Sequence, residues 1–195
     1  MKLRYILIGG LTVVLFLALL VGVGWYRSGS IEKVSIGTPN IGGPFTLTDG
    51  DGRTVTDQTY RGKWLVVYFG YTYCPDACPT GLNNIAGAMK LLGDDADKVQ
   101  PLFITVDPAR DTAAAMKVYV AAFDPRIAGL TGTPEQIAAV ARAYRVLYQR
   151  VGEGDDYVMD HSIAIYVMDP EGKYSTVFRH SMAPAEIAAA LKELL

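Results

Sequence analysis

The stretch Trp64-Leu65-Val66-Val67-Tyr68-Phe69-Gly70-Tyr71-Thr72-Tyr73-Cys74-Pro75-Asp76-Ala77-Cys78-Pro79 combines a strand, a turn and the start of a helix. Its first six residues are apolar and do not alternate with polar ones, which is typical of a strand buried on both faces. From residue 79 to residue 92, apolar side chains recur at helical spacing. The stretch therefore predicts that Cys74 lies in the turn after a central strand and that Cys78 lies in the first turn of a helix.

The segments around this stretch alternate between strand and helix patterns. The loop 49–52 (Asp-Gly-Asp-Gly) separates two short β-rich runs, 45–48 and 54–56, and predicts a hairpin. Asp111 and Thr133 are placed to cap two further helices. The remaining expected elements are a buried strand over 102–106, a strand over 162–168 with its hairpin partner over 174–178, and a last helix from 183 to 195. This order predicts an α/β fold in which helices flank a mixed sheet.

The N-terminal part of the chain has the pattern of a membrane anchor. Residues 5–26 contain no charged residue and are almost entirely apolar, which at about 1.5 Å per residue is enough to cross a hydrocarbon core of about 30 Å. A cleavable signal peptide has a shorter apolar region of about 7–15 residues, so we favour an uncleaved transmembrane helix within residues 1–27. Gly, Ser and Pro then predict a flexible tether over 28–41, and residues 42–195 form the expected folded domain.

The charge pattern argues against binding to nucleic acid. Three of the 18 basic residues fall within residues 1–27, which leaves 15 basic residues against all 20 acidic ones in the rest of the chain, a net charge of −5. The sequence contains no basic cluster or run, whereas nucleic-acid-binding domains carry one. We therefore expect no nucleic-acid partner.

Cys74 and Cys78 are the only cysteines of the chain, and three roles fit them. They can form a disulfide, bind a soft metal ion or attack a substrate, and the positive end of the helix dipole favours the thiolate form. A purely structural disulfide is disfavoured because closing a loop of about five residues removes little chain entropy. The pair therefore predicts a reactive or metal-binding site.

His161 is the candidate for a third member of this site. It follows the acidic, Gly-rich loop 152–156 and precedes an apolar strand, and sites in open α/β sheets gather at strand ends. The alternative is a histidine that caps the strand through hydrogen bonds. His180, the second histidine, has no cysteine context, and we expect it on the surface. Thiolates select Cu(I) or zinc, an imidazole also suits Cu(II), and three ligands leave an open site, which disfavours a closed structural zinc site.

Several motifs together resemble the Sco/SenC copper chaperones, which are membrane-tethered, thioredoxin-like proteins used in assembling the copper centre of cytochrome c oxidase. The most specific motif is Cys74-Pro75-Asp76-Ala77-Cys78-Pro79 with the distant Asp160-His161-Ser162. Further matches are 42–45 (Gly-Gly-Pro-Phe), 62–63 (Gly-Lys), 129–132 (Gly-Leu-Thr-Gly) and the strand that ends in Asp107-Pro108-Ala109-Arg110-Asp111. The resemblance covers residues 42–195.

The resemblance implies that Cys74, Cys78 and His161 are copper ligands, for Cu(I), Cu(II) or both. It gives Asp160 the role of a carboxylate that tunes the site or orients a neighbouring group, with strand capping as the equal alternative. Two roles fit Asp76, namely capping of the helix and contact with a partner. Two roles also fit Met159, namely an auxiliary soft ligand and a packing residue.

The function that the resemblance implies is a metallochaperone that delivers copper to a cytochrome c oxidase subunit and carries a redox-active cysteine pair. The alternative is an enzyme, a thiol–disulfide oxidoreductase in which Cys74 and Cys78 reduce the cysteines of the acceptor before metallation. A thiol reductant or another copper chaperone is a further expected partner. Because the N-terminus lacks an Arg- and Ser-rich transit segment, we favour the bacterial inner membrane, with the domain facing the periplasm, over the mitochondrial inner membrane.

Overall fold

A computed structural model of the protein describes residue 19 and residues 40–195. Apart from residue 19, the predicted anchor within residues 1–27 lies outside the described residues, as does the predicted tether up to residue 39. Across residue 19 and residues 40–195, no helix has both the length and the apolar character needed to span a membrane.

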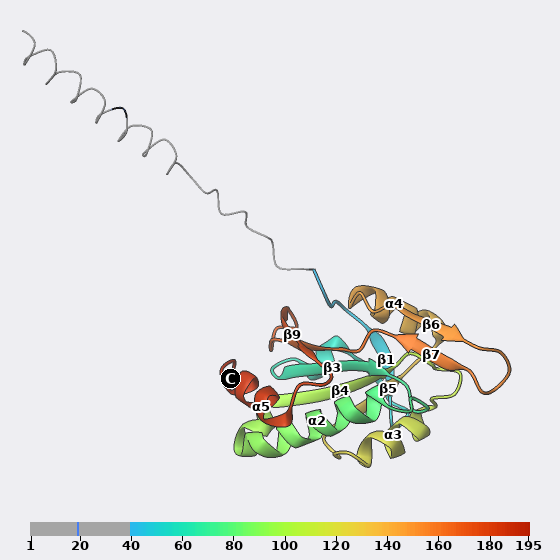
Figure 1. Cartoon of the computed structure of the whole chain (residues 1–195), viewed down its shortest axis with the longest axis horizontal. Coiled ribbons are helices and arrows are strands. Elements are labelled where there is room, and N and C mark those ends of the chain that lie inside the picture. Colours follow the sequence, from blue (N-terminus) through green and yellow to red (C-terminus); the bar gives the residue numbers. More distant parts are fainter. Residues whose placement is uncertain (1–18, 20–39) are drawn as a thin grey trace, which may run out of the picture. The chain divides into compact units, whose positions relative to one another are not determined.

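A seven-stranded mixed sheet runs through residues 40–195 (Figure 1). Its strands lie in the order β2-β1-β5-β4-β3-β8-β9, with β3, β4 and β5 parallel to one another and the outer pairs antiparallel. The strands are β1 (Thr46–Asp49), β2 (Thr54–Thr56), β3 (Trp64–Gly70), β4 (Val99–Thr105), β5 (Ala128–Thr131), β8 (Ala164–Met168) and β9 (Tyr174–Arg179). The antiparallel pairs β1–β2 and β8–β9 confirm the two predicted hairpins.

A second, two-stranded sheet stands beside the large one. β6 (Tyr148–Val151) and β7 (Val158–His161) pair antiparallel, with Tyr148 opposite His161. The acidic, Gly-rich loop 152–156 connects them, so the segment that was predicted only as a loop before a strand is the tip of a hairpin.

Helices cover both faces of the large sheet, as predicted. In Figure 1, α2 (Ala77–Leu92), α3 (Ala113–Ala121) and α5 (Pro184–Lys192) lie on one side of the sheet, and α4 (Pro134–Ala143) lies on the other. The start of α4 confirms the predicted cap, since the Thr133 hydroxyl accepts a hydrogen bond from the Gln136 backbone N–H and Pro134 follows it. Two short 3-10 turns, η1 (Asp57–Tyr60) and η2 (Gly93–Lys98), complete the described elements.

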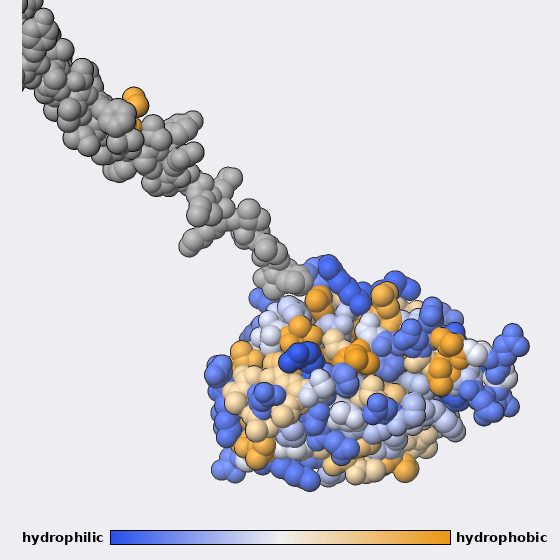
Figure 2. Space-filling view, in the orientation of Figure 1, coloured by the Kyte–Doolittle hydropathy of each residue, from blue (hydrophilic) through white to orange (hydrophobic). Residues whose placement is uncertain are grey.

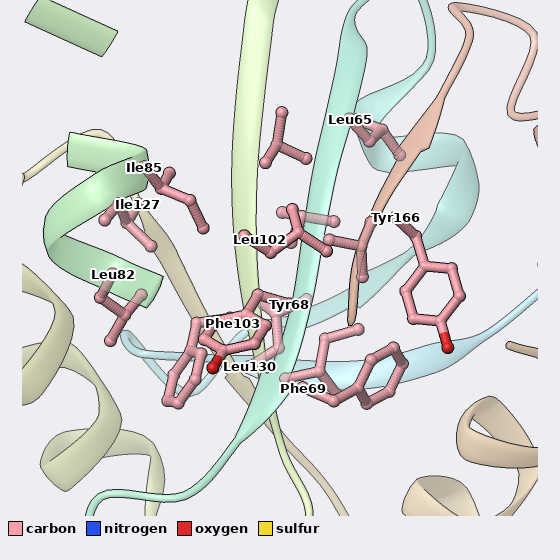
Figure 3. Close-up of a cluster of buried hydrophobic side chains, with 14 of the residues drawn as sticks. Leu65, Tyr68, Phe69, Leu82, Ile85, Leu102, Phe103, Ile127, Leu130 and Tyr166 are labelled. Atoms are coloured by element: carbon pink, nitrogen blue, oxygen red, sulfur yellow. The ribbon is translucent and has the colours of Figure 1, made fainter. Parts of the chain in front are cut away.

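Neighbouring residues of β3 fill the core on opposite faces of the sheet (Figure 3). Tyr68 points toward α2, where its hydroxyl donates to the Ala77 carbonyl at 3.0 Å and its ring centroid lies 5.9 Å from that of Phe103. Phe69 points to the other face, with its ring centroid 5.4 Å from that of Tyr144, which ends α4. Because helices cover both faces, both side chains are fully buried, which explains the unbroken apolar run.

Asp111 does not cap α3, contrary to the prediction. Thr112 is the cap, and its hydroxyl accepts from the Ala115 backbone N–H at 3.2 Å. Asp111 is fully buried instead, because the turn before α3 folds under the loop that carries Cys74. Its carboxylate binds groups of Thr72 and Thr105 there, so it is not available to the helix.

The predicted strand over 162–168 begins later than expected. β8 starts at Ala164, and His161 ends β7 rather than opening β8. The reason is that Ser162 is bound to the chain before β6: its backbone N–H donates to the Leu147 carbonyl at 2.9 Å, and its hydroxyl accepts from the Leu147 N–H. Strand β5 and the hairpin β6–β7 were not predicted from the sequence.

Hydrophobic residues on the face of the molecule shown in Figure 2 form separate patches between hydrophilic ones. Exposed large apolar side chains of the described residues include Tyr73, Leu147, Val158 and Ile163. Scattered exposed apolar side chains are normal on folded domains. Their placement becomes informative only beside the site described next.

Candidate metal centre

The two cysteines lie at the carboxyl end of β3, as the sequence predicts. The chain leaves β3 at Gly70, turns, and enters α2 at Ala77, so that Cys78 falls in the first turn of the helix. Cys78 is fully buried and Cys74 is half-buried, and both are free thiols. The Cys78 backbone N–H donates to Cys74 Sγ at 3.3 Å, so the start of the helix directs a donor toward the sulfur of Cys74.

Gly70 makes room for the buried sulfur. A Cβ atom at this position would lie 2.5 Å from Cys78 Sγ and 2.7 Å from the Phe103 ring. Such distances are far inside van der Waals contact. Glycine at the end of β3 is therefore needed for Cys78 to occupy its place.

His161 reaches the cysteines from the end of β7. Its Nε2 lies 3.5 Å from Cys78 Sγ, and its Nδ1 lies 2.9 Å from the Ser162 carbonyl oxygen. A carbonyl oxygen can only accept, so Nδ1 carries a hydrogen and donates it to Ser162, while Nε2 faces Cys78 Sγ. The ring also meets Tyr71 edge-on, with centroids 5.8 Å apart and planes at 86°.

The ligand atoms of Cys74, Cys78 and His161 all lie within 4.8 Å of one another. Among the described residues this is the group of histidine, cysteine and acidic side chains that could hold a metal ion. Residues 83 positions apart in sequence, Cys78 and His161, are thus brought into contact. A surface pocket adjoins the group, and both Cys74 and His161 line it. These two donors are therefore open to an approaching partner on that side, whereas Cys78 is fully buried.

Protonation of the two thiols is unequal. The hydrogen bond from Cys78 is the largest influence on the Cys74 thiol, and with His161 and backbone N–H groups it lowers the pKa of Cys74 to about 4, although desolvation opposes this. The same hydrogen bond, together with burial, raises the pKa of Cys78. In the metal-free site these shifts favour the thiolate form of Cys74 over that of the more buried Cys78. Metal binding to both sulfurs must release any proton that they still carry.

The donor set fits a soft ion better than a hard one. Two thiolates and a neutral imidazole suit Cu(I), Zn(II) and Cu(II), whereas magnesium and calcium prefer oxygen donors. Because the described residues bring three cysteine and histidine ligands to this point, a fourth position stays open for an incoming group. The geometry is that of a site that can load and unload an ion.

The other residues singled out in the sequence lie outside this group. Asp160 is exposed and alternates with His161 along β7, and the His161 ring binds the Ser162 carbonyl, so a role of Asp160 at the site stays a prediction. Asp76 occupies the cap position of α2, but its side chain makes no capping hydrogen bond. Met159 is half-buried and packs against the core. His180 is half-buried, and its carbonyl accepts from Asn84.

Sequence reasoning missed the residues that surround the three donors. Arg110, Asp107 and Tyr157 form a connected set beside the site, and Tyr71 packs on His161. From the sequence, the turn 107–111 is predicted to end a strand and to cap a helix through Asp111, but it receives no role at the site. The signal that could have identified it is an Asp and an Arg directly after a buried strand, at the sheet edge where the cysteines lie.

Comparison with known proteins places this arrangement in context. The family model described as SCO1/SenC matches residues 33–195. A solved structure of Bradyrhizobium japonicum ScoI with copper bound is 49% identical and has a TM-score of 0.75, covering 80% of this chain and 99% of that one. Yeast Sco1 with copper bound is 38% identical with a TM-score of 0.73, covering 80% of this chain and 88% of that one.

Among curated relatives, the mitochondrial SCO1 homologue of Mus musculus is 41% identical over 184 residues, which cover 89% of this chain. The chain spans only 65% of the length of that relative. The structural matches confirm the predicted α/β, thioredoxin-like mixed sheet flanked by helices.

Proposed function

The chain belongs to the SCO1/SenC family, and from that premise we propose that it is a copper chaperone whose Cys74, Cys78 and His161 carry copper for the copper centre of cytochrome c oxidase. The observation that supports this most is the meeting of three soft donors within 4.8 Å at the end of β3. Family members of known structure hold copper, and the donor set here suits Cu(I) and Cu(II).

The arrangement of the donors supports transfer rather than permanent retention. Copper is the cargo in this proposal, held by the two sulfurs and by Nε2 of His161. The rigid start of α2 fixes Cys78, while Cys74 is half-buried beside the surface pocket. A ligand from an acceptor protein can therefore enter at the open position and take the ion by stepwise ligand exchange. Only the dithiol form supplies both sulfurs, so oxidation of the pair switches loading off.

The proposal includes the membrane and the partners. Residues 1–27 would anchor the chain in the bacterial inner membrane, residues 28–41 would act as a tether, and residues 42–195 would face the periplasm. The acceptor would be the copper-binding subunit of the oxidase at the same membrane face. A second copper chaperone or a thiol reductant would supply the ion or keep the cysteine pair reduced.

The decisive experiment replaces each of the two histidines by alanine in the reduced protein. We expect His161→Ala to lower Cu(II) affinity by more than ~100-fold, because loss of a ligand exceeds the 10–100-fold cost of losing an outer hydrogen bond, and to change the thiolate-to-copper absorption bands. His180→Ala is the matched control and should bind copper like the wild type. Copper content, affinity and spectrum of His161→Ala that equal those of the wild type would show that this ligand set is wrong.

A second candidate function is thiol–disulfide reduction of the acceptor. The half-buried Cys74, with its lowered pKa, and the buried Cys78 have the asymmetry of an attacking and a resolving thiol. The Cys74 thiolate would attack a disulfide of the acceptor, and Cys78 would then displace the acceptor sulfur. Two electrons pass to the acceptor, and a cellular thiol reductant restores the pair. Assembly of the oxidase copper centre by His161→Ala would favour this reductase role over obligatory copper carriage.

A further inference from the structure

One turn contacts both segments that carry the three donors. Residues 107–111 follow β4, which pairs with β3 in the centre of the sheet, and they precede α3. Side chains from this turn bind the loop of Cys74 on one side and the start of β7 on the other. The turn is therefore the place where the positions of the cysteines and of His161 are linked.

Asp111 holds the cysteine loop. Its carboxylate accepts from the Thr72 backbone N–H at 3.0 Å, from the Thr72 hydroxyl at 2.5 Å and from the Thr105 hydroxyl at 2.6 Å. Thr72 lies two residues before Cys74. Asp111 is fully buried and its carboxylate has three hydrogen-bond donors around it. Hydrogen bonds to a carboxylate are stronger than those between neutral groups, so they fix the cysteine loop to the end of β4.

Arg110 and Asp107 hold the histidine hairpin. The buried Asp107 carboxylate accepts from the Tyr157 hydroxyl at 2.7 Å and from Arg110 Nε at 2.5 Å. Arg110 Nη1 donates to the Tyr157 carbonyl at 3.0 Å, and the guanidinium carbon lies 3.6 Å from the Tyr157 ring centroid. Tyr157 is buried and directly precedes β7, so these contacts fix the strand that ends at His161.

Arg110 also reaches the cysteine loop. Its guanidinium carbon lies 4.6 Å from the ring centroid of Tyr73, the residue before Cys74, and 5.8 Å from that of Tyr71, which packs edge-on against His161. The Nη2 atom is buried and has no hydrogen-bond partner among the described residues. A cation among three aromatic rings is stabilised by their faces, so Arg110 joins the two segments rather than binding only one.

From these contacts we propose that Arg110 is a positioning residue for the metal site and that, with Asp107 and Tyr157, it keeps His161 Nε2 within reach of the cysteine sulfurs. This inference rests on the proposed copper-binding role of Cys74, Cys78 and His161. It assigns a function to a turn that the proposed chemistry does not use. Arg110 acts through Tyr157 on the histidine and through Tyr73 on the cysteine loop.

The two oxidation states of copper should respond differently to the loss of Arg110. Two thiolates alone suffice for the soft Cu(I) ion, whereas Cu(II) depends on the imidazole. Releasing the hairpin lets His161 move away and leaves the cysteines in place, because Asp111 still holds their loop. A general loss of stability would weaken both ions alike, so a selective loss of Cu(II) is the mark of a positioning role.

The test compares Arg110→Met with Arg126→Met in the reduced protein. Arg126 is a matched control because it also pairs with a buried aspartate, Asp124, at 2.6 Å, and its backbone carbonyl contacts the start of β4, at the opposite end of that strand. We expect Arg110→Met to lower Cu(II) affinity by about 10–100-fold and shift the thiolate-to-Cu(II) absorption, with a smaller change for Cu(I). Arg126→Met should keep the wild-type metal affinities and spectra.

A readout without metal separates this inference from the proposed function. In the metal-free protein, the amides of β7 should exchange hydrogen faster in Arg110→Met than in the wild type, while those of β3 keep their rates. If Arg110→Met does not fold, since it leaves Asp107 with one partner fewer, Tyr157→Phe removes only the hydroxyl contact and should show the same selective change more weakly.

The outcomes point to different errors. Unchanged Cu(II) affinity and unchanged β7 exchange in a folded Arg110→Met protein would overturn the positioning role. Equal losses of Cu(I) and Cu(II) affinity would overturn it as well, because they indicate general destabilisation. A wild-type protein that binds no copper would instead disprove the proposed function, and the exchange rates of β7 would still test whether Arg110 holds the hairpin.

Discussion

The β3–α2 segment and the β6–β7 hairpin both contribute ligands to the same site, but the first is buried in the core and the second is largely exposed. Cys78 is fully buried in the core beneath the central strand, and the cysteine loop is bound to neighbouring β4 through Asp111. His161 comes from a two-stranded sheet that projects beyond the large sheet in Figure 1 and whose residues are mostly exposed. The cysteines are held by the hydrophobic core, and the histidine is held by a few polar and aromatic contacts.

The difference suits the proposed uptake and release of copper. The core holds the two cysteine sulfurs in a constant position for binding the ion, because moving them would disrupt packed side chains. A third ligand on a two-stranded element can move at a smaller free-energy cost, since few buried apolar contacts oppose local opening. The comparison predicts that the two segments differ in dynamics and in tolerance to substitution.

The largest expected effect is a difference in hydrogen exchange. Local opening free energies range from near zero up to the global value of about 5–15 kcal/mol. We expect the amides of β3 and β4 to open only with global unfolding and those of β6 and β7 to exchange about a thousandfold faster, a difference of about 4 kcal/mol. Mass spectrometry or NMR of the metal-free protein measures this. Equal protection of the two segments would contradict the claim that the hairpin is held less firmly than the central strands.

Substitution of Gly70 tests how rigidly the core holds Cys78. In Gly70→Ala the new Cβ would lie 2.5 Å from Cys78 Sγ, and overpacking of this kind costs about 1–3 kcal/mol of unfolding free energy. We expect copper affinity to fall together with stability, as measured by denaturant unfolding and metal titration.

Gly87→Ala is the control for this substitution. Its Cβ would lie 2.8 Å from Pro184, where α2 meets α5, away from the cysteines. It should lose a comparable free energy of unfolding and retain copper binding. If both variants bound copper like the wild type, the sulfur position would be more adaptable than the packing indicates.

The smallest expected effect concerns acid stability of the sheet. The hydrogen bond from Arg126 is the largest influence on Asp124 and lowers the pKa of its carboxyl below the ordinary 3.8. A carboxyl with a lowered folded pKa stabilises the fold above its ordinary pKa, and this contribution is lost as the pH falls through the folded value. Asp124→Asn should therefore cost about 1–2 kcal/mol at pH 7 and progressively less below about pH 4.

Unfolding curves of the wild type and Asp124→Asn between pH 2 and pH 7 check this, and copper affinity at pH 7 should be the same in both. A constant difference in unfolding free energy across this range would contradict the assignment. A change in copper affinity would mean that the far end of the sheet is coupled to the site.

The sequence by itself determined the central strand, the turn with Cys74 and the helix with Cys78, because apolar runs, turn residues and helical spacing act over a few neighbouring positions. It also determined the cap at Thr133 and two hairpins. It misplaced the cap of α3, since Asp111 and Thr112 are equally good caps locally and only burial beneath the cysteine loop decides between them.

Only the tertiary structure decided the rest of the site. The polar, exposed hairpin β6–β7 has no apolar pattern that predicts it, and the contact of His161 with Cys78 joins residues 83 positions apart. The proposed positioning role of Arg110 depends on its contacts with Tyr157 and Tyr73, which the sequence does not reveal. The physical reason is range: local preferences select strands, turns and helices, whereas the distances between donors depend on how separate segments pack at the end of β3.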